Sequence, residues 1–241
     1  TAKRAQAATG ELVHGVAAEL GQVKETPDKP SDDAPPDPTP TFKTYDERRE
    51  AALGAYQKVS QKYASSGAGI LAKLGEAGEL LDKRDWDGAI AAFQSVRSTS
   101  LAAADVDVRG RAIEGTAYAL EGKGDVEGAL KALRELENTD AKGLKELALY
   151  GQARILFAKG DRDKAKDLLK TARERLHAST EEQPQRTLAR QVDELLRRFR
   201  LAHISGLNSV LDRVHPLIRL RIGALIFLVV LEPGVNCLQI R

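Results

Sequence analysis

The side chains with catalytic or metal-binding potential are few and scattered in this chain of 241 residues. They are four histidines and one cysteine: His14, His177, His203, His215 and Cys237. The histidines lack the spacing of a metal site, and the cysteine stands in none of the motifs that surround a nucleophilic thiol. The sequence therefore predicts a protein that is not an enzyme and that has no catalytic residue, no metal and no cofactor.

Three aspartates recur at turns and could be mistaken for an acidic triad: Asp85, Asp125 and Asp161. Two of the turns contain glycine, in the sequences Gly-Lys-Gly-Asp and Lys-Gly-Asp. Neither matches the phosphate-binding pattern GxxxxGK[ST], and neither follows a strand. We interpret them as turns of helix hairpins that need left-handed backbone, and we interpret the aspartates as N-caps of the helices that follow.

Composition limits the classes of protein that remain. The chain is 42% hydrophobic and 30% charged with a formal net charge of +2, which excludes disorder throughout, collagen and a multi-span membrane protein. No strong field favours nucleic acid or an anionic membrane surface as a bulk partner, and the arginines after residue 172 alternate with acids as on a solvated helix face. One cysteine rules out an internal disulfide and leaves the compartment open. Because the chain has no methionine, Thr1 is either a processed start or a cut into a longer protein, and we favour the second interpretation.

The order of segments predicts an all-α body behind a separate N-terminal helix. Residues 1–25 have apolar side chains at helical spacing and predict one amphipathic helix, with Leu12, Val13, Val16, Ala17, Leu20 and Val23 as its apolar positions. Residues 26–43 are rich in proline and predict an extended, mobile linker. Residues 44–202 show helical periodicity broken by short turns, which predicts a repeat domain.

Self-comparison aligns three segments without gaps, at about 70–100, 110–140 and 146–176. Small residues stand eight positions before and four after each turn aspartate, and a bulky one follows four later. These are Ala77, Ala117 and Ala153, then Ala89, Ala129 and Ala165, then Phe93, Leu133 and Leu169. Small residues let two antiparallel helices approach, and bulky ones fill the gap to the next hairpin, as Trp86 after the first turn is also expected to do. The pattern predicts an all-α, right-handed solenoid of helix hairpins.

The sequence also predicts how the repeat array begins and ends. Residues 44–64 read as the second helix of a half repeat, because Ala52 lies 37 positions before Ala89, and this helix would cap the array without a partner. Residues 187–202 predict a capping helix. Residues 203–241 form a hydrophobic appendage in which Ile222 to Leu231 are apolar or small. Three interpretations of it stay open: a strand or helix buried on the repeats, a non-native or frame-shifted tail, and an exposed docking segment.

These residues resemble the tetratricopeptide repeat, whose order of small, leucine or tyrosine, small and aromatic positions recurs over roughly Ile70 to Arg175. The family's first-helix tryptophan, Leu-Gly pair and closing proline are absent, so the repeats are degenerate. The resemblance implies a protein or peptide partner on the concave face of the first helices. Carried over position by position, it gives six partner-binding candidates: Arg111, Glu114, Tyr118, Tyr150, Arg154 and Phe157. For each, a merely solvated or packed role stays open.

The same family has a Lys/Asn clamp for a C-terminal carboxylate. The corresponding positions here include Leu74, Gly78, Glu114 and Tyr118, and none is asparagine. Binding of a chaperone tail of that type is therefore not expected. Mixed charge with two tyrosines suits a peptide or a helix, and no nucleic acid is expected as partner.

The whole arrangement of helix, spacer, half repeat and three repeats resembles the periplasmic part of the ancillary Sec-translocon subunit family. The resemblance implies one membrane-spanning helix ahead of the domain, association with the Sec translocon and a periplasmic chaperone, and a location on the periplasmic face of the bacterial inner membrane. Residues 1–25 hold no run of roughly 20 apolar residues, so the anchor is expected before Thr1, in a segment absent from this chain. The alternatives are a soluble cytoplasmic scaffold or co-chaperone, and an accessory domain of an enzyme encoded upstream.

Overall fold

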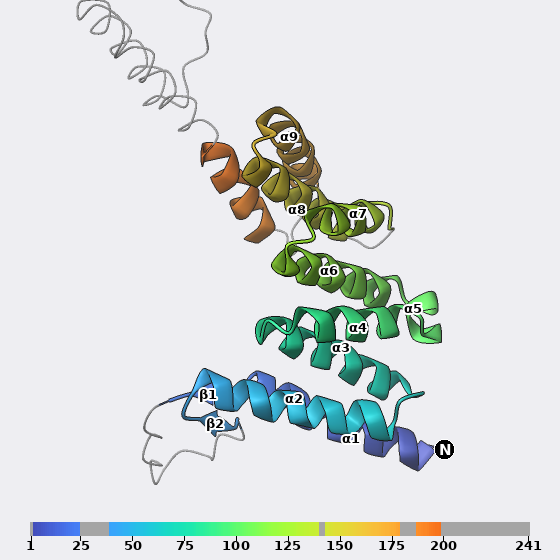
Figure 1. Ribbon diagram of the computed structural model, residues 1–241. Coiled ribbons are helices and arrows are strands. Elements are labelled where there is room, and N and C mark those ends of the chain that lie inside the picture. The colour runs from blue at the N-terminus through green and yellow to red at the C-terminus, as the bar shows by residue number, and fades with distance from the viewer. Residues whose placement is uncertain (1, 25–38, 140–142, 179–186, 199–241) are drawn as a thin grey trace, which may run out of the picture.

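The protein is an all-α solenoid of stacked helices, as the repeats predict (Figure 1). The computed structural model describes residues 2–24, 39–139, 143–178 and 187–198. The helices are α1 (Ala2–Glu19), α2 (Tyr45–Lys62), α3 (Gly67–Asp82), α4 (Trp86–Arg97), α5 (Ser100–Ala104), α6 (Val106–Lys123), α7 (Val126–Glu137), α8 (Leu144–Lys159), α9 (Arg162–Ala178) and a last helix at 187–198. Two short strands, β1 (Gln22–Val23) and β2 (Thr41–Phe42), pair in parallel.

Three hairpins, α3–α4, α6–α7 and α8–α9, carry the sequence repeat. The first two turns have the capping chemistry that was predicted: the carboxylates of Asp85 and Asp125 cap α4 and α7 by accepting the third backbone N–H of each helix. At the third turn the carboxylate of Asp161 accepts the Lys164 ammonium at 2.8 Å. Gly124 and Gly160 have φ near +90° at the ends of α6 and α8, where the left-handed backbone favours glycine. The first turn instead places Arg84 at φ 62°.

The core of the repeats is built from the residues that the alignment singled out. All six alanines that flank the turns are buried, as are Phe93, Leu133 and Leu169. Two of the bulky residues lie against a glycine of the next first helix: a Cβ on Gly115 would lie 2.1 Å from the Phe93 ring, and one on Gly151 would lie 3.0 Å from Leu133. Trp86 packs in the same way between hairpins, because a Cβ on Gly122 would lie 2.7 Å from its ring. The expected inter-repeat packing is confirmed.

A ladder of ion pairs runs beside this core. A lysine at the C-terminal end of each first helix, which is the last residue of α6 and α8 and the C-cap of α3, pairs with an acidic residue in the first half of the second helix one repeat earlier. The pairs are Lys83 with Glu50 at 3.9 Å, Lys123 with Asp87 at 2.5 Å, and Lys159 with Glu127. The three pairs occupy the same repeat positions, so the ladder follows the stacking register.

The connection between the first and second repeats contains a helix that sequence periodicity missed. Thr99 caps the short helix α5, and Asp105 both ends α5 and caps α6 with its carboxylate. The five residues of α5 explain why the turn aspartates Asp85 and Asp125 lie farther apart than the usual period of about 34 residues.

The N-terminal helix differs from its prediction in length, in face and in position. It ends at Glu19, and Val23 lies in strand β1 rather than in the helix. The buried side of α1 is made of small residues, Ala8, Gly15 and Ala18, whereas Val13 and Leu20 are 59% and 71% exposed. Small residues occupy this interface because Gly15 lies against the ring of Tyr56, where a Cβ would be 2.6 Å from a ring carbon.

The expectation of a tethered helix beside an unpartnered α2 is wrong, because α1 packs along α2 and also touches α3 (Figure 1). Parallel pairing of Gln22 with Thr41 and of Val23 with Phe42 holds the two ends of the connecting segment together. Of the linker expected at 26–43, residues 25–38 lie outside the described residues. Therefore α1 and α2 pack as the first hairpin of the array, although the segment that connects them is much longer than a turn.

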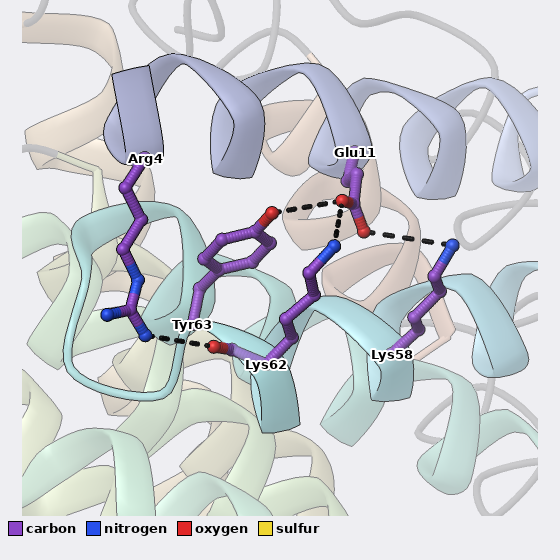
Figure 2. A network of polar contacts seen from close by, with 5 residues as sticks. All are labelled: Arg4, Glu11, Lys58, Lys62 and Tyr63. Atoms are coloured by element: carbon purple, nitrogen blue, oxygen red, sulfur yellow. Dashed lines mark hydrogen bonds and ion pairs between the residues drawn. The ribbon is translucent and has the colours of Figure 1, made fainter. Parts of the chain in front are cut away.

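Polar contacts fix the register of α1 on α2 (Figure 2). The carboxylate of Glu11 accepts the Lys62 ammonium at 2.6 Å and the Tyr63 hydroxyl at 3.0 Å, and Lys58 lies 3.8 Å from its other oxygen. These donors, Lys62 first, lower the pKa of Glu11. Arg4 donates to the carbonyl of Lys62 at 3.4 Å. Arg4 and Glu11 belong to α1, whereas Lys58, Lys62 and the C-cap Tyr63 belong to α2, and residues 20–44 connect the two helices.

A buried carboxyl lies where α1, α2 and α3 meet. Glu79 of α3 is only 8% exposed, and burial, together with the charges of Glu19 and Asp82, raises its pKa to about 7. Arg49 and Arg48 oppose this shift without cancelling it. Glu19 itself accepts a hydrogen bond from the hydroxyl of Tyr56.

The last described helix, 187–198, packs on α8 and α9 through Leu188, Val192 and Leu195. This is the capping role that was expected of 187–202, although residues 199–202 and the whole appendage 203–241 lie outside the described residues. Among the helices that are described, none is long and apolar enough to cross a membrane.

Candidate protein-binding face

The candidate residues lie on one face of the first helices, at four equivalent positions in each. We name this set the first-helix face. It consists of Leu71, Leu74, Gly78 and Leu81 on α3, Arg111, Glu114, Tyr118 and Glu121 on α6, and Leu147, Tyr150, Arg154 and Phe157 on α8. Within each helix the steps are three, four and three residues, which place the four positions on one side.

The α6 and α8 rows are joined by a two-fold hydrogen-bonded ion pair. The guanidinium of Arg154 donates to both oxygens of Glu121 at 2.5 Å. Both side chains are partly shielded from solvent, at 39% and 27% exposure, and this hydrogen bonding raises the pKa of Arg154. Arg111 pairs in turn with Glu114 at 2.9 Å. Each charge in the two rows is therefore neutralised by a neighbour.

Tyr118 lies half-buried within this network. Burial, and then the charge of Glu114, raise the pKa of its phenol above the ordinary value, while Arg154 acts in the opposite direction. The hydroxyl therefore stays protonated beside the carboxylate of Glu114. Tyr150 is also half-buried and lies near enough to Arg154 to influence its charge.

Phe157 differs from the other predicted residues, because its ring takes part in the α8–α9 hairpin. It lies 5.7 Å from the guanidinium of Arg162 and packs on the buried cluster of α8, α9 and the last helix. The structure thus brings Arg111, Glu114, Tyr118, Tyr150 and Arg154 into one network and gives Phe157 a packing contact.

Glu121 was missed by the sequence analysis. Glu121 pairs with Arg154, which lies 33 positions later in the sequence, and no local sequence pattern predicts this ion pair. The α3 row was missed as a binding element because its residues were compared only with a charged clamp. Counting along the repeats would have identified Glu121 and the α3 row, because Leu81 lies 40 positions before Glu121 and Leu71 lies 40 positions before Arg111.

Other chemistry is not supported in the part of the chain that the structure describes. No group of three His, Cys, Asp or Glu side chains there could hold a metal ion. A charged hollow between α2 and the end of α3 is lined by three acids and three bases, and so has no net charge: Asp46, Arg49, Glu50, Asp82, Lys83 and Arg84. Neither observation indicates a site for catalysis.

Comparison with known proteins identifies the type of repeat. A family model of the tetratricopeptide repeat matches residues 147–175, which cover most of α8 and α9. No curated protein and no solved structure matches the chain. The match and the all-α solenoid together describe a helical-repeat scaffold of the class that binds protein partners and is typically non-catalytic.

Proposed function

We propose that the chain is a non-catalytic scaffold that binds a segment of another protein on the first-helix face. The observation that carries this proposal is the network of Tyr118, Glu121 and Arg154, which connects two successive repeats with half-buried polar groups. Half-buried aromatic and arginine side chains are the residues that most often anchor protein interfaces. A face fixed by such pairs needs little reordering when a partner binds.

In its finer form, the proposal is a membrane-tethered periplasmic adaptor that works beside the Sec translocon and passes emerging chains to periplasmic chaperones. What supports it is the resemblance of the segment order, an N-terminal helix and a proline-rich spacer ahead of degenerate repeats. The tether in this proposal is a segment absent from this chain. The soluble cytoplasmic scaffold is the alternative that the test must separate from it.

The test is site-specific photo-crosslinking in cells that carry the full-length gene. A photo-reactive amino acid is placed at Tyr118 or Tyr150, and at the exposed Lys131 on α7 as a matched control away from the first-helix face. We expect capture of translocon subunits, a periplasmic chaperone or emerging chains from the two tyrosine positions and not from Lys131. Capture of cytosolic proteins alone would overturn the periplasmic proposal, and equal capture from Lys131 would overturn the assignment of the face.

Protease protection on fractionated cells gives an independent answer on location. A membrane-bound repeat body that an external protease cleaves after outer-membrane permeabilisation supports the periplasmic adaptor. A soluble, protected one supports the cytoplasmic scaffold.

A further inference from the structure

The ring of Tyr56 on α2 lies against both neighbouring helices. A Cβ on Gly15 of α1 would lie 2.6 Å from a ring carbon, and one on Gly75 of α3 would lie 2.7 Å from another. The tyrosine is only 3% exposed, and its hydroxyl donates a hydrogen bond to the carboxylate of Glu19, the last residue of α1. Helices α1, α2 and α3 therefore meet at this side chain, to which α1 contributes a packing surface and an acidic group.

Glu79 of α3 brings a second acidic group to the same junction. Its side chain is buried, and its charge, like that of Glu19, acts on the hydroxyl of Tyr56. Burial, and then the charges of Glu19 and Asp82, raise the pKa of Glu79 to about 7. A proton on Glu79 therefore removes a repulsion between the carboxyl groups of α1 and α3, and the loss of that proton restores it.

The bases near Glu79 do not neutralise its charge. Arg49 and Arg48 of α2 lower its pKa, but by less than burial and the neighbouring acids raise it. Helix α4 also packs against α3, and its charged side chains are paired with residues of later helices: Asp87 with Lys123, and Arg97 with Glu135. Ionised Glu79 is therefore a buried charge beside another acid, which is an unfavourable arrangement.

Helix α1 is the element of this junction that can move away with the smallest loss of packing. Its buried residues in the cluster shared with α2 are the alanines Ala8 and Ala18, and small side chains bury little apolar surface. The connection of residues 20–44 is much longer than the turns of the later hairpins, so the docked position of α1 is not enforced by a tight turn. Polar groups therefore have a large share in holding α1.

From this arrangement we infer that α1 is a pH-dependent latch, which is held on α2 and α3 while Glu79 is protonated and is released when the charges of Glu79 and Glu19 repel each other. Release breaks the hydrogen bond of Tyr56 to Glu19 and uncovers the side chains of Tyr56 and Val59 on α2. None of these residues belongs to the first-helix face, so the inference goes beyond the proposed function and does not depend on it.

Two carboxyl groups set the pH range of the latch. The pKa of Glu79 is raised from 4.5 to about 7, so its contribution to docking is fully present below about pH 4.5 and is lost as the pH rises through 7. Glu11 acts in the opposite sense, because Lys62 and then Tyr63 lower its pKa, and its contribution is lost only in acid, below about pH 4.5. Helix α1 should therefore be held most tightly near pH 5 and loosen progressively up to about pH 7.5.

The first experiment is hydrogen exchange of the full chain, resolved by segment and corrected for the intrinsic effect of pH on exchange. An isolated helix of 18 residues is marginal in water, so the amides of a released α1 exchange. Between pH 5 and 7.5 the protection of α1 should fall by about tenfold or more, while that of α6 and α7 changes little. Constant protection of α1, or an equal loss in α2 and α3, would overturn the inference.

A pair of buried carboxyl groups on α3 provides matched variants. Glu79→Gln removes the charge with little change of size, and the protection of α1 should then be independent of pH between 5 and 7.5. Glu76, one turn earlier, is equally buried, but its carboxylate accepts hydrogen bonds from Lys73 and Ser60. Glu76→Gln should keep the pH dependence. A pH dependence that survives Glu79→Gln, or that disappears in Glu76→Gln, would overturn the inference.

Replacing Glu19 tests whether the repulsion acts through α1. In Glu19→Gln the amide oxygen can still accept the hydroxyl of Tyr56, but the charge that faces Glu79 is gone. The loss of α1 protection between pH 5 and 7.5 should become at least about threefold smaller. Because Glu19 is exposed, this variant is expected to fold even if Glu79→Gln does not. An unchanged loss of protection in Glu19→Gln would mean that Glu79 acts only between α2 and α3, and α1 would not be the latch.

Discussion

The N-terminal hairpin of α1 and α2 and the later hairpin of α6 and α7 bring two helices together by different means. In α6–α7 the connection is a tight turn at Gly124 and Asp125, and the interface is apolar, with Ala117, Ala129 and Leu133 fully buried. In α1–α2 the connection spans residues 20–44. Small side chains of α1 share a buried cluster with Tyr56, Val59 and Tyr63, and the hydrogen bonds of Glu11 and Glu19 are added to this apolar contact.

This difference teaches which interaction fixes register in each place. A tight turn sets the register of its helices by geometry, so a featureless apolar interface is sufficient. A long connection does not, because its closure is only a modest entropic constraint. Directional polar contacts then specify the position of α1, and the hairpin is expected to open more easily than the others.

Burying a charge in each of the two hairpins should produce the largest difference between them. Ala117→Arg places a cation between α6 and α7 and should cost about 3–5 kcal/mol of unfolding free energy through overpacking and charge burial. Ala8 is as fully buried between α1 and its neighbours. Ala8→Arg should instead release α1 and leave α3 to α9 folded, because a repeat depends mainly on its nearest neighbours. Urea unfolding with segment-resolved hydrogen exchange checks both. Loss of protection in α6–α9 on Ala8→Arg would contradict the difference between the hairpins.

The pH dependence of stability sharpens the comparison, because the buried Glu79 lies at the N-terminal junction. Its pKa of about 7 in the folded chain exceeds the ordinary value of 4.5, so the folded state holds more protons between these pH values. Stability should therefore be greatest below about pH 4.5 as far as this group is concerned, and fall by about 3 kcal/mol at most as the pH rises from 4.5 to above 7. Urea midpoints measured from pH 4.5 to 8 should show this slope. Glu79→Gln should remove it, and the exposed Glu174→Gln should not.

Replacing glycine with alanine should change the free energy of unfolding in opposite directions in the two regions. Gly115 of α6 has the Phe93 ring where a Cβ would stand, at 2.1 Å, so Gly115→Ala should cost about 1–3 kcal/mol. Gly54 of α2 has nothing within 4 Å, so Gly54→Ala should add about 1 kcal/mol through helix propensity. Thermal and urea unfolding of the two variants check these values. Destabilisation by both would mean that α2 is less open than the structure has it.

The repeat core could be predicted from the sequence because its signal is local and recurs. Ala77, Ala117 and Ala153 identify themselves by spacing, and the glycine two residues before each follows the same count. The docking of α1 could not be predicted in this way. Helix α1 has two stripes, one of small residues and one that includes Val13 and Val16 and is continued by Leu20 just after the helix. The larger side chains made the exposed stripe look like the buried one.

For the candidate face, the sequence indicated where the first helices would present side chains, and five of its six residues lie in one network. It could not indicate which charges neutralise one another. The pairing of Glu121 with Arg154 depends on how far one repeat is rotated against the next, and this angle is set by packing of bulky residues such as Leu133 on Gly151. The free or paired state of a charge is nevertheless what decides the chemistry of a ligand.

The smallest effect is expected from the ion-pair ladder of the repeats. Lys123 and Asp87 are about half and three-quarters exposed, so water and salt compete for both charges, and Lys123→Met should leave the urea midpoint within experimental error. Glu11 makes an equally short ion pair, but its carboxylate is 25% exposed and also accepts the hydroxyl of Tyr63. Glu11→Gln should therefore speed hydrogen exchange in α1 measurably while that of α6 is unchanged. If Lys123→Met loosens α6 as much as Glu11→Gln loosens α1, polar contacts would hold register throughout the array, and the turns of the later hairpins would not be sufficient to set it.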